Sequence, residues 1–189
     1  GVLIRRADRS HRQIVNEKGW VEHDPEEILK NTLLVCEDVI AQAEISAEEI
    51  CAMGISNQRE TSLAWNKITG KPVYNAIVWQ CSRAVEICER HKEEAESIRQ
   101  KTGMMLSPYF PASKLQWIME NVPEAKVLAD RDDLAVGTID TWLVYNLTRD
   151  HAFKTDYSNA SRTQLFNIVD LAWDKELLKT FQIPESAMA

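Results

Sequence analysis

The stretch that most constrains the fold is an apolar run that ends abruptly in polar residues. Residues 50–56 are largely apolar and predict a buried strand, and Asn57, Gln58, Arg59 and Glu60 follow it directly. Neighbouring residues on a regular strand point to opposite faces of the sheet, so Arg59 and Glu60 can reach one ligand only where the backbone turns. In open α/β sheets, ligands bind in the crevice beyond the strand ends. This stretch therefore predicts a ligand site at the end of a strand.

Arg59 and Glu60 together suit a ligand that carries adjacent hydroxyl groups. An Arg side chain supplies a fixed fork of donors, whereas an ionised Glu supplies only acceptors. Because a hydroxyl both donates and accepts, the pair can hold neighbouring hydroxyls. The alternative is a solvated surface ion pair, and the two residues taken alone favour it, since exposed pairs are common and contribute little to stability.

Composition limits the classes of function that remain. The chain has 189 residues, of which 44% are hydrophobic, and its formal net charge is −7. This length and content suit one domain with one good core. The acidic balance, without a block of Lys and Arg, argues against nucleic acid or an acidic membrane surface as a partner. No apolar run approaches the roughly 18 residues of a membrane helix and no signal peptide is visible, so the sequence predicts a cytoplasmic protein.

Neither the cysteines nor the histidines predict a metal site. Four cysteines lie in apolar stretches without a Cys-x-x-Cys pair, which is typical of reduced core thiols: Cys36, Cys51, Cys81 and Cys88. The four histidines are scattered, with no partner at the spacing of metal ligands.

The order of predicted elements indicates an α/β fold with a mixed sheet flanked by helices. Extended segments are expected at residues 2–7, 13–15, 50–56, 61–65, 74–79, 151–155 and 165–168. Helices are expected at residues 25–40, 82–101, 111–122 and 139–147 and after residue 174, with loops at residues 130–133 and 156–162. Residues 20–23 are expected to end the first strand pairing. The helix at 82–101 has four residues expected to face the core: Val85, Cys88, Ala95 and Ile98.

Helix boundaries carry the clearest local signals. Asp24 followed by Pro25 predicts a helix start, and Thr138 and Asp174 are predicted to cap two later helices. Gly103 is expected to end the charged helix that precedes it. Pro123 is expected to stop the helix that begins at Pro111.

Six blocks of this sequence resemble the FGGY family of carbohydrate kinases. Residues 109–121 (Tyr-Phe-Pro-Ala-Ser-Lys-Leu-Gln-Trp-Ile-Met-Glu-Asn) fit the first signature of that family at every constrained position. Within the family, five further blocks resemble the glycerol kinases: residues 19–25, 55–61, 75–81, 137–142 and 155–162. The resemblance covers nearly the whole chain. It implies an actin-like, ribonuclease-H-like fold and transfer of the γ-phosphate of ATP, with Mg²⁺, to a terminal hydroxyl of glycerol.

The resemblance also implies four substrate-binding residues. Arg59 and Glu60 match the pair that binds the polyol hydroxyls, Trp79 matches the residue that packs on the carbon skeleton, and Tyr109 matches a donor to another hydroxyl. A small polyol has hydroxyls around a thin apolar edge, so charged partners and one aromatic wall suit it. Taken alone, Trp79 and Tyr109 favour core packing; the resemblance favours substrate contact.

Two parts of the family pattern have no match in these residues. The Gly-Thr-Thr-Ser turn that holds the ATP phosphates is not found, and the Asp-Gln pair that supplies the general base is expected beyond residue 189. Residues 1–189 are therefore expected to be an incomplete N-terminal kinase domain, the polyol-binding half, without catalytic, nucleotide-binding or metal-binding residues and inactive alone. The parent is expected to be a homo-oligomer. The alternatives are a non-catalytic module with a kinase-derived fold, or a related kinase for another polyol or sugar.

Overall fold

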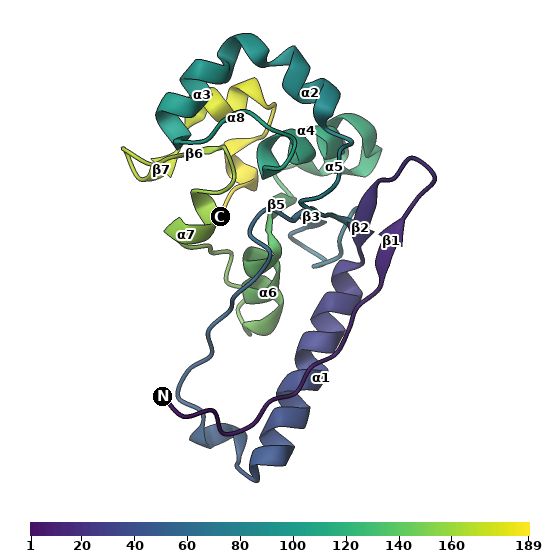
Figure 1. The fold of residues 1–189 in the computed structure, drawn as a ribbon, viewed down its shortest axis with the longest axis vertical. Coiled ribbons are helices and arrows are strands. Elements are labelled where there is room, and N and C mark those ends of the chain that lie inside the picture. Colours follow the sequence, from purple (N-terminus) through teal and green to yellow (C-terminus); the bar gives the residue numbers. More distant parts are fainter.

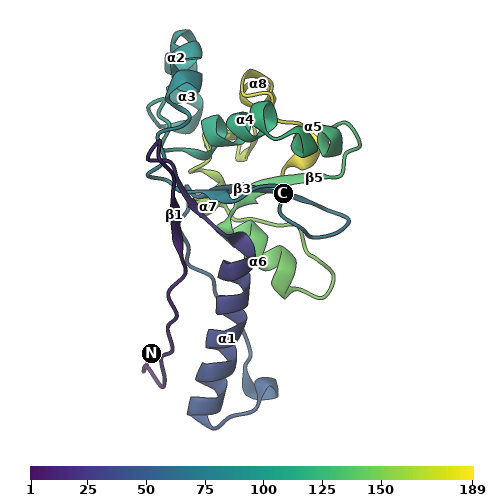
Figure 2. The ribbon, with the colours of Figure 1, turned by 90° about the vertical axis from the view of Figure 1, so that its right-hand side faces the viewer.

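A five-stranded sheet lies between two layers of helices in the computed structural model, which describes residues 1–189 (Figures 1 and 2). The strand order is β1-β2-β4-β3-β5, and a separate two-stranded hairpin pairs β6 with β7. The strands are β1 (Gln13–Val15), β2 (Val21–His23), β3 (Ser62–Asn66), β4 (Ala76–Ile77), β5 (Leu134–Thr138), β6 (Phe166–Asn167) and β7 (Ala172–Trp173).

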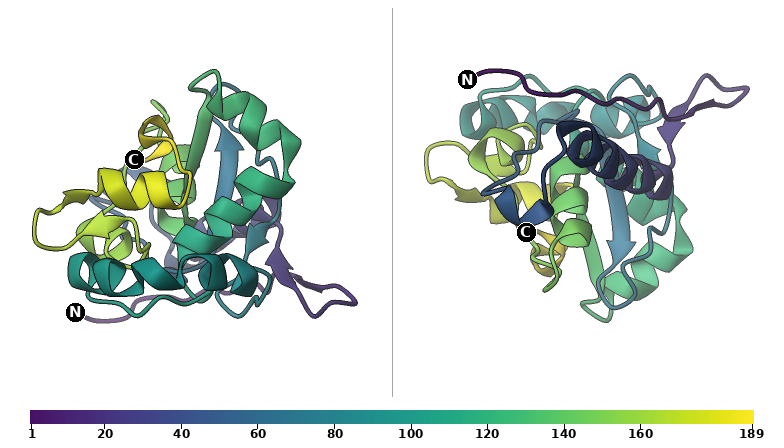
Figure 3. Two further views of the ribbon diagram at one scale, coloured as in Figure 1. Left: turned by 90° about the horizontal axis from the view of Figure 1, so that it is seen from above. Right: turned by 90° about the horizontal axis from the view of Figure 1, so that it is seen from below.

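Helices cover both faces of the sheet (Figures 2 and 3). On one face lie α1 (Pro25–Ala43) and α6 (Ile139–Leu147). On the other lie α4 (Pro111–Asn121), α5 (Pro123–Ala129) and α8 (Lys175–Thr180), with α2 (Val85–Arg90) and α3 (Ala95–Thr102) beside them. The short helices are α7 (Tyr157–Ala160), η1 (Ala47–Glu49), η2 (Lys92–Glu94) and η3 (Glu185–Ala187). No helix is both long enough and apolar enough to cross a membrane.

The central pairing joins β3 to β5 over five residues, from Ser62 opposite Thr138 to Asn66 opposite Leu134. Successive side chains of a strand point to opposite faces, so each strand contributes to two cores. Ala64 faces the larger core under α4, α5 and α8. Leu63 and Trp65 face the smaller core, where Trp142 of α6 lies edge-on to Trp65 at 5.6 Å between ring centroids.

The expected α/β class is confirmed, but every pairing in the five-stranded sheet is antiparallel, where a mixed sheet was predicted. A parallel pair needs a crossover connection, usually a helix. The helix α1 leads from β2 to residues 50–56 and would provide one. Those residues are not paired, so the sheet has no parallel neighbour.

Two predicted strands do not form. Residues 2–7 and 50–56 are extended but unpaired, and most of their apolar side chains are exposed, among them Val2 at 84% and Met53 at 57%; Ile55 alone packs against the smaller core. A strand is stable when neighbouring backbone groups take its hydrogen bonds. No strand pairs with either run, and residue Arg5 of the first run bonds instead to α1, where its Nε donates to the Gln42 carbonyl. Cys51 is exposed for the same reason, and so is not the core thiol that was expected.

Other differences lie in the second half of the chain and around the first hairpin. Residues 21–23 form β2 between β1 and β4 instead of ending the pairing. Thr155, in a predicted strand at 151–155, donates to Asp140 and belongs to no strand. The predicted loop at 156–162 contains α7, because Asp156 accepts from the Asn159 amide and caps it. The expected strands near residues 74–79 and 165–168 are only two residues long, as β4 and β6.

One helix prediction was wrong in extent. The segment 82–101 is broken into α2, η2 and α3, because His91 has non-helical backbone angles, and Val85, predicted to face the core, is 43% exposed. Pro123 stops the helix that begins at Pro111, as predicted: α4 ends at Asn121, and Pro123 takes the first position of a new helix, α5, where its missing N–H costs nothing. Cys88 and Ile98 are buried as predicted.

The local signals at helix ends are mostly confirmed. Asp24 Oδ1 accepts from the Glu26 amide at 2.9 Å, and Asp174 Oδ1 accepts from the amides of Glu176 and Leu177. Gly103 ends α3 in the left-handed region with a φ of 72°. Thr138 precedes α6 as predicted, but its hydroxyl donates to Asp140 and does not cap the helix.

Lys114 of α4 is a fully buried cationic residue, with 0% of its surface exposed. Its Nζ donates to the backbone carbonyls of Glu60, at 3.3 Å, and Tyr109. Burial lowers the pKa of Lys114 to about 7, although Cys81 and the Glu60 carboxylate oppose that shift. The side chain therefore joins two loops at the cost of a desolvated charge.

Replacing Lys114 with Met should remove a pH dependence of stability. The pKa of this lysine is about 7 when folded, against 10.5 for an ordinary lysine. Between these values the unfolded chain binds more protons, so the free energy of unfolding should rise with pH in the wild type. The variant should gain most relative to the wild type near pH 7 and lose that advantage towards pH 10.

Urea unfolding followed by tryptophan fluorescence at pH 7, 8, 9 and 10 measures this difference. Lys126→Met is the matched control, because Lys126 is exposed on α5. A constant difference between wild type and Lys114→Met at all four pH values would contradict the prediction.

Candidate functional site

Three segments meet at the predicted site. Arg59 and Glu60 precede β3, Trp79 follows β4, and Tyr109 lies just ahead of α4. The rings of Trp79 and Tyr109 are 5.6 Å apart between centroids with an interplanar angle of 56°, and each residue is about a third exposed. The two rings form an aromatic wall that is open to solvent.

The backbone turns at Arg59 and Glu60, as a shared ligand requires. The Thr61 amide donates to the Gln58 carbonyl at 3.2 Å and closes the turn, and the Thr61 hydroxyl donates to Gln58 Oε1 at 2.8 Å. Both residues of the pair therefore leave the strand direction just before β3 begins.

The Glu60 side chain is buried and held by an arginine. Glu60 Oε1 accepts from Nε of Arg162 at 2.7 Å, and 8% of the Glu60 side chain is exposed. The Glu60 carbonyl accepts from Lys114 and from the Ser62 hydroxyl, at 3.1 Å for the latter. No protein group donates to Glu60 Oε2, so this oxygen remains available to a ligand hydroxyl.

Arg59 is held much less firmly than Glu60. It is exposed, and its one hydrogen bond runs from Nη1 to the Ser158 hydroxyl at 3.5 Å, the longest separation that still counts as a bond. Most of its donors are free. The ion pair between Arg59 and Glu60 that was considered as an alternative is absent, because Glu60 pairs with Arg162 instead.

Lys114 and Phe110 connect the charged residues to the aromatic wall. Lys114 Nζ donates to the backbone carbonyls of Glu60 and of Tyr109, so one nitrogen fixes the separation of these two segments. The Arg162 guanidinium lies 5.0 Å from the ring centroid of Phe110, which in turn lies edge-on to Tyr109 at 5.1 Å. The structure thus brings all four predicted residues into one neighbourhood.

Asp140 links two of the segments that carry the site. It is buried at the start of α6 and accepts from the Thr155 hydroxyl at 2.7 Å and from Asn57 Nδ2 at 3.4 Å. It also accepts from the Thr138 hydroxyl. Asp140 therefore ties the segment before Arg59 to the segment that leads to α7 and Arg162.

Sequence reasoning missed Arg162, Lys114 and Asp140 as contributors to the site. All three lie in the blocks that carry the family resemblance, but no role was assigned to them. The available signal was the charge itself: Lys114 and Asp140 interrupt the apolar faces of α4 and α6. A charge at a core-facing position predicts a buried partner, although not which one.

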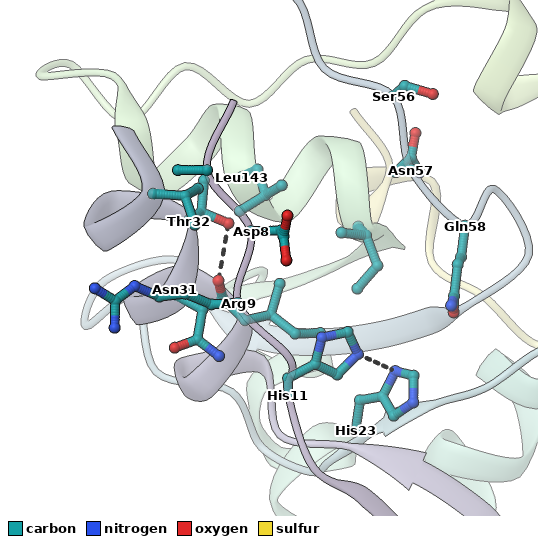
Figure 4. Close-up of a pocket in the computed structure, with 14 residues that line it drawn as sticks. Asp8, Arg9, His11, His23, Asn31, Thr32, Ser56, Asn57, Gln58 and Leu143 are labelled. Atoms are coloured by element: carbon teal, nitrogen blue, oxygen red, sulfur yellow. Dashed lines mark hydrogen bonds between the residues drawn. The ribbon is translucent and has the colours of Figure 1, made fainter. Parts of the chain in front are cut away.

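A separate cavity of 470 Å³ lies between the N-terminal segment and α1, and residues 56–58 form part of its lining (Figure 4). His11 and His23 both line it, and a hydrogen bond joins His11 Nε2 to His23 Nδ1 at 3.2 Å. Burial, with a smaller effect from His11, lowers the pKa of His23. None of Arg59, Glu60, Trp79 and Tyr109 lines this cavity. No group of three or more His, Cys, Asp or Glu side chains is arranged to hold a metal ion.

Comparison with known proteins shows the family. Residues 1–189 match the model of the FGGY family of carbohydrate kinases, N-terminal domain. The chain is 52% identical to a glycerol kinase of Treponema denticola over 190 aligned residues, which cover all of this chain and 38% of that protein. A glycerol kinase of Caldanaerobacter subterraneus subsp. tengcongensis is 50% identical over the same coverage.

The solved structure of Plasmodium falciparum glycerol kinase with ADP superposes with a TM-score of 0.86 at 39% identity, over 92% of this chain and 35% of that one. The chain thus spans a little over a third of the length of these proteins. Their α/β fold is the actin-like, ribonuclease-H-like fold that the sequence predicted. The chain belongs to the FGGY family of carbohydrate kinases and matches its N-terminal domain.

Proposed function

We propose that residues 1–189 form the polyol-binding part of a longer, cytoplasmic glycerol kinase, which transfers the γ-phosphate of ATP to glycerol and yields glycerol 3-phosphate. The observation that carries the proposal is the assembly of Arg59 and Glu60 beside the rings of Trp79 and Tyr109, from three separate segments. Similarity to proteins named glycerol kinase supports glycerol as the substrate.

Each residue of the site has a distinct task towards a polyol. Arg59 has free donors for one or two hydroxyl oxygens, and Glu60 Oε2 can accept a hydroxyl proton. The Tyr109 hydroxyl makes no hydrogen bond within the protein and can donate to a further oxygen. The exposed Trp79 face can cover the carbon skeleton, since aromatic rings pack well on C–H groups.

ATP with Mg²⁺ would supply the phosphoryl group and neutralise its charge during transfer. The residues described here do not fit that role, because no carboxylate cluster among them suits the metal ion. We therefore assign to this chain only binding and orientation of the acceptor, and assign the nucleotide to the part of the relatives that these residues do not cover.

Two other functions would use the same fold. A kinase for another polyol or sugar would need a longer site, and gluconate kinase of Lactobacillus acidophilus superposes well, with a TM-score of 0.81, but at only 25% identity. A non-catalytic module would have no reason to keep Arg59 exposed next to an open carboxylate oxygen. The free donors of Arg59, the open oxygen of Glu60 and the aromatic wall favour the glycerol kinase.

Replacing Arg59 with Ala in the complete kinase should weaken glycerol use. Each charged hydrogen bond lost costs roughly 1.5–3 kcal/mol, so kcat/KM for glycerol should fall about tenfold to more than a hundredfold. A coupled assay with MgATP measures this, with Arg149→Ala as the control because Arg149 is exposed after α6. Wild-type kinetics in a correctly folded Arg59→Ala variant would refute the assignment.

Replacing Glu60 with Gln should also reduce kcat/KM for glycerol. The amide keeps the size of the side chain but replaces one acceptor oxygen by a donor, so it cannot both pair with Arg162 and accept a hydroxyl proton. We expect a loss of about tenfold or more, measured in the same assay. Normal turnover of glycerol by this variant would remove Glu60 from the site while leaving Arg59 in place.

A further inference from the structure

We propose that Arg162 is a positioning residue for the acceptor site: it holds the Glu60 carboxylate so that one oxygen faces the substrate, and it couples this carboxylate to the aromatic wall. The proposal rests on the proposed function, since it concerns how the same site binds its polyol. Arg162 itself is not taken to touch the substrate.

The contact between Arg162 and Glu60 is short and largely shielded from water. Arg162 Nε donates to Glu60 Oε1 at 2.7 Å, and the side chains are 29% and 8% exposed. A charge-assisted bond of this length in a buried position fixes the direction of the carboxylate plane. Since Oε1 is occupied, Oε2 is the oxygen left for a hydroxyl.

Arg162 also contacts Phe110, which supports the aromatic wall of Trp79 and Tyr109. Its guanidinium lies over the ring of Phe110 at 5.0 Å, within the range of a cation–π contact. Phe110 packs edge-on against Tyr109, whose ring faces Trp79. The Arg162 side chain therefore contacts both the Glu60 carboxylate and Phe110, the residue that packs behind the aromatic wall.

The backbone around Arg162 is fixed by a short helix and by α4. The Arg162 amide donates to the Asn159 carbonyl at 3.0 Å, and Asp156 caps α7 just before it. The Thr163 carbonyl accepts from the Ala112 amide in the first turn of α4 at 2.9 Å. Arg162 is thus anchored to the helix that also carries Lys114, and its side chain needs only to span from that anchor to Glu60.

No other cation bonds to the Glu60 carboxylate. Arg59 is directed to Ser158, and Lys114 is committed to two backbone carbonyls. Without Arg162 the Glu60 carboxylate would be buried with an unpaired charge, which is unfavourable. The carboxylate would then turn towards water or bind another donor, and the geometry offered to a hydroxyl would be lost.

The test is a double-mutant cycle of Arg162→Gln and Glu60→Gln in the complete kinase. Arg162→Gln alone should raise KM for glycerol about tenfold to a hundredfold, as expected for one charged bond, with kcat changed less than about threefold. In the Glu60→Gln background the same change should alter KM less than about twofold, because the carboxylate that it positions is gone. Equal effects in both backgrounds would overturn the proposal and would indicate direct contact of Arg162 with substrate.

Two further variants separate positioning from a purely structural role. Arg162→Lys keeps the charge but not the planar fork, so its KM for glycerol should lie between those of the wild type and Arg162→Gln. If Arg162→Gln does not fold, Arg162→Lys takes its place in the double-mutant cycle. Arg149→Gln is the matched control, since Arg149 is exposed and bonded to none of these residues. Wild-type KM in both Arg162 variants would likewise overturn the proposal.

Failure of this inference differs from failure of the proposed function. If the wild-type kinase does not phosphorylate glycerol, the proposed function is wrong. If Glu60→Gln has no effect, Glu60 leaves the site and the role of Arg162 is wrong with it. If the wild-type kinase and Glu60→Gln both behave as expected while Arg162→Gln leaves KM unchanged or acts independently of Glu60, only the role of Arg162 is wrong.

Discussion

The ladder between β3 and β5 is the constraint on which the rest of the structure depends. It is the longest pairing of the sheet, and its two strands supply buried side chains to the cores on both faces. The strands are antiparallel, so the start of β3 lies beside the end of β5, with Ser62 opposite Thr138. Glu60 and Asp140, each two residues beyond that pair, therefore lie at the same end of the two strands. The site lies at this end because the ladder ends there.

Precision at that end comes from contacts between segments that are far apart in the chain. Lys114 bonds to Glu60 across 54 residues, Asn57 to Asp140 across 83, and Arg162 to Glu60 across 102. Loops are otherwise the most mobile parts of a domain, and a binding site needs its groups held within a fraction of an ångström. The bonds of three buried charged residues, Glu60, Lys114 and Asp140, hold the backbone and side chains of these loops in place. Their desolvation, visible in the lowered pKa of Lys114, is the cost of a defined site.

Signals within one turn of the chain could be predicted from the sequence, and long-range pairings could not. Asp24, Gly103 and Asp174 mark helix ends through bonds to residues two to four positions away, and all three are confirmed. By contrast β5 was missed, because all five of its residues are buried and show no alternation. The run 50–56 was predicted from its apolar content, but a strand also needs a partner that the sequence pattern does not reveal.

The same limit applies to the site. The positions of Arg59, Glu60, Trp79 and Tyr109 followed from the family resemblance, and the structure brings them together. The partners of Glu60 could not be predicted, because Arg162 is held against it only by the folding of α7 onto α4. The positions of Arg162 and Glu60 in the sequence, 102 residues apart, do not predict their contact.

The structure also gives Arg59 and Glu60 unequal roles within the pair. Glu60 is ordered by folding itself, through Arg162 and its own backbone bonds, so little side-chain freedom is left to lose when a ligand binds. Arg59 is exposed and has one long bond, and ordering such a side chain costs up to about 2 kcal/mol. In the proposed polyol site, part of what Arg59 gains from substrate hydroxyls must offset that cost. Under that proposal Glu60 fixes where the polyol sits, and Arg59 closes on it after arrival.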